Sequence, residues 1–186
     1  AGLFPFHAWF PDAYNNAPHS SSALLSGIVS KAYIFVFIKI VFRVFGTETL
    51  TSFNLQPFYY TLGCIAMLIG SVFAFMQDDI KKMVSFSSVA QIGYIFMGFG
   101  INTKLGYAAA CFHMLFHAFT KAMLFVSTGN LVTKAGKSKI SDMRGMGYKC
   151  PVSAVAFWVG GLSMIGIPLF MGFISKLNFA TAAFTS

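Results

Sequence analysis

Five long apolar segments limit this chain to one kind of fold. They cover residues 22–45, 57–76, 83–101, 106–132 and 151–184. Each of them is close to, or longer than, the roughly 20 residues that cross a bilayer as a helix. Only 10% of the 186 residues are charged, whereas soluble domains carry about a quarter. We therefore predict an all-α, polytopic transmembrane helix bundle, in which residues 1–186 form part of a single membrane domain.

The fifth segment is too long for one simple crossing and is interrupted near its middle. Gly166, Pro168 and Gly172 are expected to break a helix there. A break at membrane depth has to face protein or a wet cavity, because unpaired backbone groups are costly in hydrocarbon. Transporters commonly use such discontinuous helices to handle ions. The segment thus predicts a transporter fold with a discontinuous helix, and Lys176 follows the break.

The charges of the loops predict how the bundle is oriented. Loop 77–82 contains two lysines, and loop 133–150 contains four lysines and an arginine. The opposite loops, 46–56 and 102–105, contain Lys104 as their only cation. Cytoplasmic loops are enriched in Lys and Arg. We therefore expect loops 77–82 and 133–150 on the cytoplasmic side of a bacterial or archaeal cytoplasmic membrane.

Basic side chains lie inside the apolar segments, where acidic ones do not. These basic residues are Lys31, His113, His117, Lys121 and Lys176. An intramembrane cation costs a few kcal/mol, so it normally faces a partner or a cavity and indicates function. A structural pairing with a neighbouring helix is the alternative for any single one of them.

The stretch HMLFHAFTKAML places His113, His117 and Lys121 on one stripe of a helix, because a four-residue spacing returns to the same face. Burial disfavours the charged form of an amine, and imidazole titrates near neutral pH. Such a series of bases suits the relay of protons better than the binding of Na⁺, which prefers oxygen ligands.

Metal and cofactor sites are disfavoured. Structural zinc needs four ligands and catalytic zinc usually three, and the HExxH glutamate is missing from HMLFH. Two histidines one turn apart on one helix cannot bracket a haem, and the three cysteines form no CxxC pair. We expect no cofactor and no metal. The cations are divided between short loops and apolar segments, so the net charge of +8 does not indicate a nucleic-acid partner.

Four stretches, in this order, carry a family resemblance. They are FPFHAWFPDAYNNAPHSSSALLSGIVSK, DDIKKMVSFSSVAQIGY, HMLFHAFTKAMLF and GIPLFMGFISK. Together they resemble the antiporter-like subunits of respiratory complex I, of membrane-bound hydrogenases and of Mrp-type Na⁺/H⁺ antiporters. The resemblance covers nearly the whole chain, and it implies the central part of a longer subunit built from two inverted repeats. We accordingly interpret the sequence as a fragment with a partial inverted-repeat fold.

The resemblance also implies residue roles. Lys31 is similar to the lysine of the helix after the first break, and Lys176 to that of the second broken helix. His113, His117 and Lys121 are similar to the central relay between two half-channels. The implied function is proton translocation in a redox-driven complex I-type pump, with redox chemistry confined to other membrane subunits. The alternatives are an Mrp-type antiporter subunit without a redox partner, with Na⁺ as a second ion, and a non-pumping assembly scaffold.

Overall fold

The computed structural model describes residue 3, residues 5–46, residue 49 and residues 52–185, and this part of the chain is helical without a β-strand. The helical elements are α1 (Trp9–Asn16), α2 (His19–Leu24), η1 (Leu25–Val29), α3 (Ser30–Ile40), η2 (Val41–Phe45), α5 (Leu55–Phe75), α6 (Ile80–Gly100), α7 (Lys104–Ala135), η3 (Ile140–Met143), α8 (Met146–Lys149), α9 (Pro151–Ile165) and α10 (Met171–Phe184). The predicted all-α bundle is confirmed. Loop 46–56 is described only at residues 46, 49 and 52–56.

Four helical stretches are long and apolar enough to cross a membrane. They are His19–Phe45, Leu55–Phe75, Ile80–Gly100 and Lys104–Ala135. Each begins a few residues before the apolar segment that predicts it. The reason is capping: the Asp79 carboxylate accepts the N–H groups of Lys81 and Lys82 at 2.8 and 3.0 Å, which fixes the start of α6. Hydropathy marks only the apolar part of a helix, whereas the cap marks its first turn.

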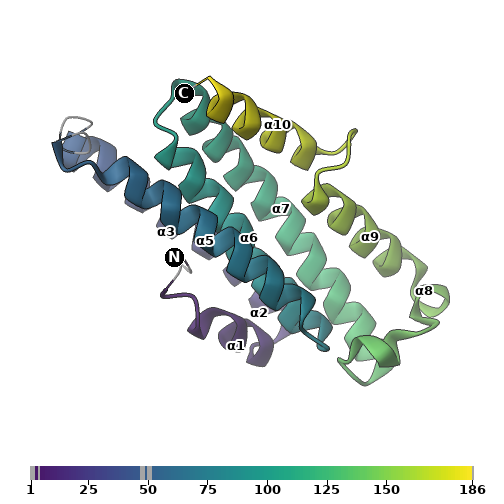
Figure 1. Ribbon diagram of the computed structural model, residues 1–186. Coiled ribbons are helices and arrows are strands. Elements are labelled where there is room, and N and C mark those ends of the chain that lie inside the picture. The colour runs from purple at the N-terminus through teal and green to yellow at the C-terminus, as the bar shows by residue number, and fades with distance from the viewer. Residues whose placement is uncertain (1–2, 4, 47–48, 50–51, 186) are drawn as a thin grey trace.

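Helix α7 is the centre of the bundle (Figure 1). It contacts α6, the α9–α10 pair, α2 and η1. Helix α5 packs on α6 through glycine, since a Cβ on Gly63 would lie only 2.8 Å from the Gly93 carbonyl oxygen, and one on Gly70 only 2.5 Å from the Ala90 nitrogen. Small residues allow such close approach of helices in lipid. Other helices therefore cover α6 and α7, and many of the buried positions of the fold lie on these two helices.

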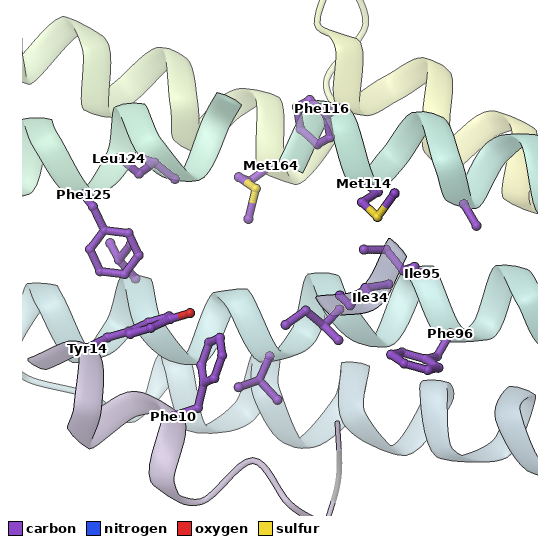
Figure 2. Packing of buried hydrophobic residues seen from close by; sticks show 14 of the residues in the cluster. Phe10, Tyr14, Ile34, Ile95, Phe96, Met114, Phe116, Leu124, Phe125 and Met164 are labelled. Atoms are coloured by element: carbon purple, nitrogen blue, oxygen red, sulfur yellow. The ribbon is translucent and has the colours of Figure 1, made fainter. Parts of the chain in front are cut away.

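A hydrophobic cluster surrounds these interior positions (Figure 2). Phe10 and Tyr14 of α1 approach α7 at Phe125, and Ile34 of α3 and Ile95 of α6 fill the middle of the cluster. Other large apolar side chains point outward, among them Leu68, Phe75 and Trp158. An outer apolar surface of this kind is expected where lipid replaces water around a helix bundle.

Loops 77–82 and 133–150 meet at one end of the bundle. The N–H of Ile80 donates to the Ser138 carbonyl at 3.1 Å, and the N–H of Ile140 donates to the Asp78 carbonyl at 2.8 Å. The Ser138 hydroxyl also donates to the Asp79 carboxylate. The two loops therefore lie on the same face of the membrane.

Candidate functional site

The basic stripe of α7 is fully enclosed. His113, His117 and Lys121 each have an exposed fraction of 0%. Because α7 is one unbroken helix through this region, the four-residue spacing stacks the three side chains. The two imidazole rings are nearly parallel, with centroids 6.2 Å apart and an interplanar angle of 15°. The stripe faces protein on every side rather than lipid.

Lys121 is held by α6. Its Nζ donates to the Val84 carbonyl at 2.6 Å and to the Ser87 hydroxyl at 2.5 Å. The Val84 carbonyl is also approached by the Ser88 hydroxyl at 3.3 Å. Ser88 Oγ in turn lies 3.3 Å from Ser26 Oγ, on the turn before α3. Val84 and Ser88 of α6 thus lie between Lys121 and Ser26 of η1.

Lys31 stands at the other end of this connection, immediately after the π-wound turn η1. In this turn the N–H of Ser30 bonds to the Leu25 carbonyl, five residues back. The Ser26 carbonyl, four residues back, accepts from the Ser30 hydroxyl at 3.0 Å and from Lys31 Nζ. Lys31 Nζ also lies 3.3 Å from Ser30 Oγ. Lys31 and Lys121 therefore belong to one cluster, in which each amine bonds a backbone carbonyl and the paired hydroxyls of Ser26 and Ser88 lie between these carbonyls.

The helix break lies between Ile165 and Met171. Gly166 ends α9 in the left-handed region at φ +89°, and Pro168 lies in the connecting segment. Leu169 also has a positive φ, of +85°, which the sequence did not indicate. Gly172 is already within α10, where it lets α10 approach the carbonyl of Ser163. The glycines therefore serve two purposes, a left-handed helix end and a close contact between the two half-helices.

Lys176 binds the end of the first half-helix. Its Nζ donates to the Met164 and Ile165 carbonyls at 2.7 and 2.9 Å. These carbonyls are among the last four of α9, which have no partner within the helix and carry its negative dipole end. The ammonium also lies 5.1 Å from the centroid of the Tyr94 ring. Lys176 thereby links both half-helices to α6.

His113 belongs to the same cluster as the break. Its Nδ1 lies 2.9 Å from Ser175 Oγ, on α10 next to Lys176. The centroid of the Tyr94 ring lies 5.7 Å from that of the imidazole. A second cluster consequently forms around His113, Ser175, Lys176 and Tyr94.

His117 lies between the two clusters and is bonded to neither. Both of its ring nitrogens are buried without a hydrogen-bond partner among the described residues, as is Nε2 of His113. Charge still couples the clusters, because Lys31 interacts electrostatically with His113, His117 and Lys121. The structure thus buries Lys31, His113, His117 and Lys121 in one interior region and places the partly buried Lys176 beside it, at the helix break.

The sequence alone did not identify several residues that bond the interior bases or are buried with them. The serines that hold the bases (Ser26, Ser30, Ser87, Ser88 and Ser175) looked like ordinary polar residues of apolar segments. Lys81 was predicted as a loop cation, but only 5% of it is exposed, and its Nζ donates to the Asn15 carbonyl at 2.9 Å and to the Ala17 carbonyl. The signal that could have identified them is their position in two of the motifs that carry the family resemblance. These motifs contain Ser26, Ser30, Ser87, Ser88 and Lys81.

No group of three or more His, Cys, Asp and Glu in the described part of the chain could hold a metal ion. Two ion pairs lie at the loop end of the bundle, Lys82–Asp12 (3.6 Å) and Lys137–Asp142 (3.8 Å). The partners of the interior bases described above are instead hydroxyls and carbonyls.

Comparisons with known proteins agree on one family. The family described as "NADH:quinone oxidoreductase/Mrp antiporter, TM" matches residues 1–186. NADH-quinone oxidoreductase subunit N of Desulforudis audaxviator is 36% identical over 177 residues, which is 94% of this chain and 34% of that protein. The chain therefore spans about a third of the length of this curated relative.

Two solved structures have the same fold. An archaeal respiratory complex, the membrane-bound sulfane sulfur reductase, contains a chain with a TM-score of 0.88 and 32% identity, covering 97% of this chain and 37% of that one. The Mrp complex from Dietzia sp. DQ12-45-1b contains one with a TM-score of 0.90 and 28% identity, covering 99% of this chain and 34% of that one.

Proposed function

Because this chain belongs to the NADH:quinone oxidoreductase/Mrp antiporter transmembrane family, we propose that it moves protons across the membrane through its interior bases. The path consists of Lys31, Lys121, His117, His113 and Lys176. The observation that carries the proposal is the burial of Lys31, His113, His117 and Lys121 in one interior region, with Lys176 partly buried beside them. Serine hydroxyls and backbone carbonyls hold four of these five bases. Intramembrane ionisable residues in such surroundings are typical of ion pathways.

The chemistry of the partners supports proton transfer. An amine or imidazole holds a proton in one state and accepts one in the other, and a hydroxyl can donate and accept at once. The first cluster places Lys31 and Lys121 on either side of the Ser26–Ser88 hydroxyl pair, and the second places His113 against Ser175, next to Lys176 at the helix break. His117 is the one base between them, and its imidazole can hold a proton in one state and accept one in the other.

The partners of the chain are also a proposal. We propose that it is one membrane subunit of a larger complex, embedded in the cytoplasmic membrane with loops 77–82 and 133–150 on the cytoplasmic side. In a redox-driven pump of the complex I type, other subunits would carry out the electron transfer. The name of the Desulforudis relative, a subunit of NADH-quinone oxidoreductase, supports this version.

A second candidate is an Mrp-type Na⁺/H⁺ antiporter subunit without a redox partner, which the likeness to the Dietzia Mrp complex favours. The two versions differ in their driving force. A redox-driven subunit moves protons only while the electron donor is oxidised, whereas an antiporter moves them when a Na⁺ gradient is imposed. Transport that needs Na⁺ and no electron donor would select the antiporter.

The test replaces one base from each cluster in the full-length subunit within its assembled complex. Proton transport into vesicles is measured with a pH-sensitive dye for Lys121→Ala and Lys176→Ala. Each is expected to lower the transport rate about tenfold or more, because a positioned proton carrier is lost. Lys39→Ala is the control, since Lys39 is an exposed cation whose Nζ lies 4.9 Å over the Phe35 ring. Unchanged transport in both test variants would leave only the assembly-scaffold alternative.

A further inference from the structure

The ring of Tyr94, on α6, lies against both bases of the second cluster. Lys176 Nζ lies over this ring, 5.1 Å from its centroid. The centroid of the His113 imidazole lies 5.7 Å from the same centroid. Tyr94 is therefore in contact with the histidine of α7 and with the lysine of the helix break at once, from a third helix.

Packing fixes the plane of the Tyr94 ring. It stacks on Phe179 of α10, with centroids 6.1 Å apart and an interplanar angle of 26°. Phe179 is itself buried and fits against Gly98 of α6, where a Cβ would collide with the phenyl ring. The His113 ring meets Phe179 edge-on, with centroids 5.5 Å apart. The Tyr94 ring is thus held where its face meets Lys176.

The Tyr94 ring and the helix-end carbonyls act differently on the amine of Lys176. The Met164 and Ile165 carbonyls can accept N–H groups of the ammonium or of the neutral amine, because both forms carry N–H groups. A π face attracts the ammonium specifically, because the attraction acts between the ring quadrupole and a positive charge. The contact with Tyr94 therefore favours one protonation state of Lys176, the charged one.

The titratable groups around Lys176 do not supply a counter-charge. Residues 151–184, which form α9, the break and α10, contain no second titratable side chain. On α7, His113 faces Lys176 through its contact with Ser175, and on α6 the facing group is Tyr94. A charge on His113 would repel the ammonium of Lys176. Among these groups, the Tyr94 ring and the helix-end carbonyls stabilise the charged form.

We propose that Tyr94 is a positioning residue for the step between His113 and Lys176, in which its ring holds the ammonium form of Lys176 at the helix break. The proposal rests on the proposed function. When a proton passes from the His113 imidazolium to the neutral Lys176 amine, the imidazole becomes neutral, and the ring face and the two carbonyls receive the ammonium. When Lys176 releases this proton, its amine is neutral again and every other group is unchanged.

Two substitutions at position 94 test this role in the full-length subunit within its assembled complex. Tyr94→Phe keeps the π face and removes the hydroxyl, whereas Tyr94→Leu removes the ring. The initial rate of proton transport is measured against pH. In Tyr94→Leu the alkaline half-maximum should fall by about half a pH unit or more, because the ammonium loses its contact with the ring. Tyr94→Phe should keep the half-maximum of the wild type.

Fluorinated phenylalanines at position 94 keep the test valid if Tyr94→Leu does not fold. Each fluorine weakens the negative face of the ring with little change in its volume. Phenylalanines with one, two and three ring fluorines should therefore lower the alkaline half-maximum stepwise. A role of Tyr94 in packing alone would not produce this trend.

The matched control is Tyr107→Leu, which removes a ring packed edge-on against Phe42, with centroids 5.2 Å apart. It should leave the alkaline half-maximum unchanged. Equal shifts in Tyr94→Phe and Tyr94→Leu, or no trend with fluorination, would overturn the role of the ring. Lys176→Ala separates the two proposals: if it abolishes transport while the Tyr94 variants leave the pH profile unchanged, the path through Lys176 stands and the role of Tyr94 does not.

Discussion

The interior lysines are stabilised by neutral groups. Lys121 bonds to a carbonyl and a serine hydroxyl, and Lys176 bonds to two carbonyls at a helix end. A carboxylate partner would bind the charged amine tightly and resist its deprotonation. Hydroxyls and carbonyls position the amine through hydrogen bonds without holding its charge so strongly. This is the chemical difference between a structural ion pair and a residue that exchanges a proton.

Ser175 provides a direct test of how the histidines are held. Its hydroxyl is fully buried, lies 2.9 Å from His113 Nδ1 and donates to the Gly172 carbonyl at 3.0 Å. Ser175→Ala should lower the free energy of unfolding by about 1–3 kcal/mol, because Nδ1 of His113 loses the one partner it has among the described residues. Proton transport should fall as well, since the ring is no longer oriented toward α10. Equilibrium unfolding in mixed micelles and the vesicle assay measure the two effects.

Ser71→Ala is the matched control, because Ser71 is an exposed serine of α5 whose hydroxyl bonds only its own helix, at the Met67 carbonyl. Its effect on unfolding should stay within about 0.5 kcal/mol. Equal effects of the two substitutions would contradict a specific role of Ser175 at His113.

The sequence predicted the bases but not their partners. The four-residue spacing in α7 was enough to place His113, His117 and Lys121 on one stripe, because that periodicity is local. The partner of Lys121 is 34 positions away, and the partner of His113 is 62 positions away. Which helices meet depends on packing between segments, and periodicity within one segment carries no information about it.

At the scale of elements, two irregular stretches position the site. The π-wound turn η1 turns the Ser26 carbonyl toward Lys31, and the interruption between α9 and α10 presents helix-end carbonyls to Lys176. The second was predictable, because Gly166 and Pro168 disfavour a continuous helix. The first was not, since LSGIV contains nothing that excludes an ordinary α-turn.

Gly172 tests the contact between the two half-helices. A Cβ at this position would collide with the Ser163 carbonyl and would lie 3.1 Å from the Phe116 ring. Gly172→Ala should therefore force α9 and α10 apart and lower the free energy of unfolding by about 1–3 kcal/mol. Transport should fall with it, because Lys176 would lose its alignment with the Met164 and Ile165 carbonyls. Unfolding in mixed micelles and proton uptake are measured on the same preparation.

The same helix pair offers a control in Gly161, whose Cβ would meet nothing within 4 Å. Gly161→Ala should leave transport unchanged and stabilise α9 by up to about 1 kcal/mol, because alanine favours a helix over glycine. If Gly172→Ala were as harmless as Gly161→Ala, close contact at the break would have no part in holding Lys176.

At the scale of the whole molecule, the topology and the position of the bases are connected. The four helices that are long enough to cross a membrane each overlap an apolar segment that hydropathy identifies, because each segment is long enough to be recognised by itself. Hydropathy could not predict that α7 occupies the centre, since α5 and α7 are both apolar and only packing distinguishes them. The bases of α7 are consistent with its central position, because ionisable side chains are tolerated in a membrane where protein covers them. This relation becomes visible only once the packing is known.

Orientation in the membrane is the remaining property of the whole molecule, and two exposed positions report it. Loops 77–82 and 133–150 lie on one face, where the second carries five cations, whereas Lys104 lies at the opposite end of α7. The excess of cations favours the cytoplasm for the first face. In the full-length subunit with all native cysteines replaced by alanine, Ser141→Cys should react with a membrane-impermeant maleimide only when the cytoplasmic face is accessible. Lys104→Cys should react only from the opposite side.

Right-side-out and inside-out vesicles of the same cells supply the two faces, and detergent-opened vesicles show that both thiols can react. Helix α7 crosses the membrane once between Lys104 and Ser141, so the two positions should lie on opposite sides. Labelling of both positions from one side would contradict this topology. The reverse pattern, with Ser141→Cys reactive from outside, would keep the fold but invert it.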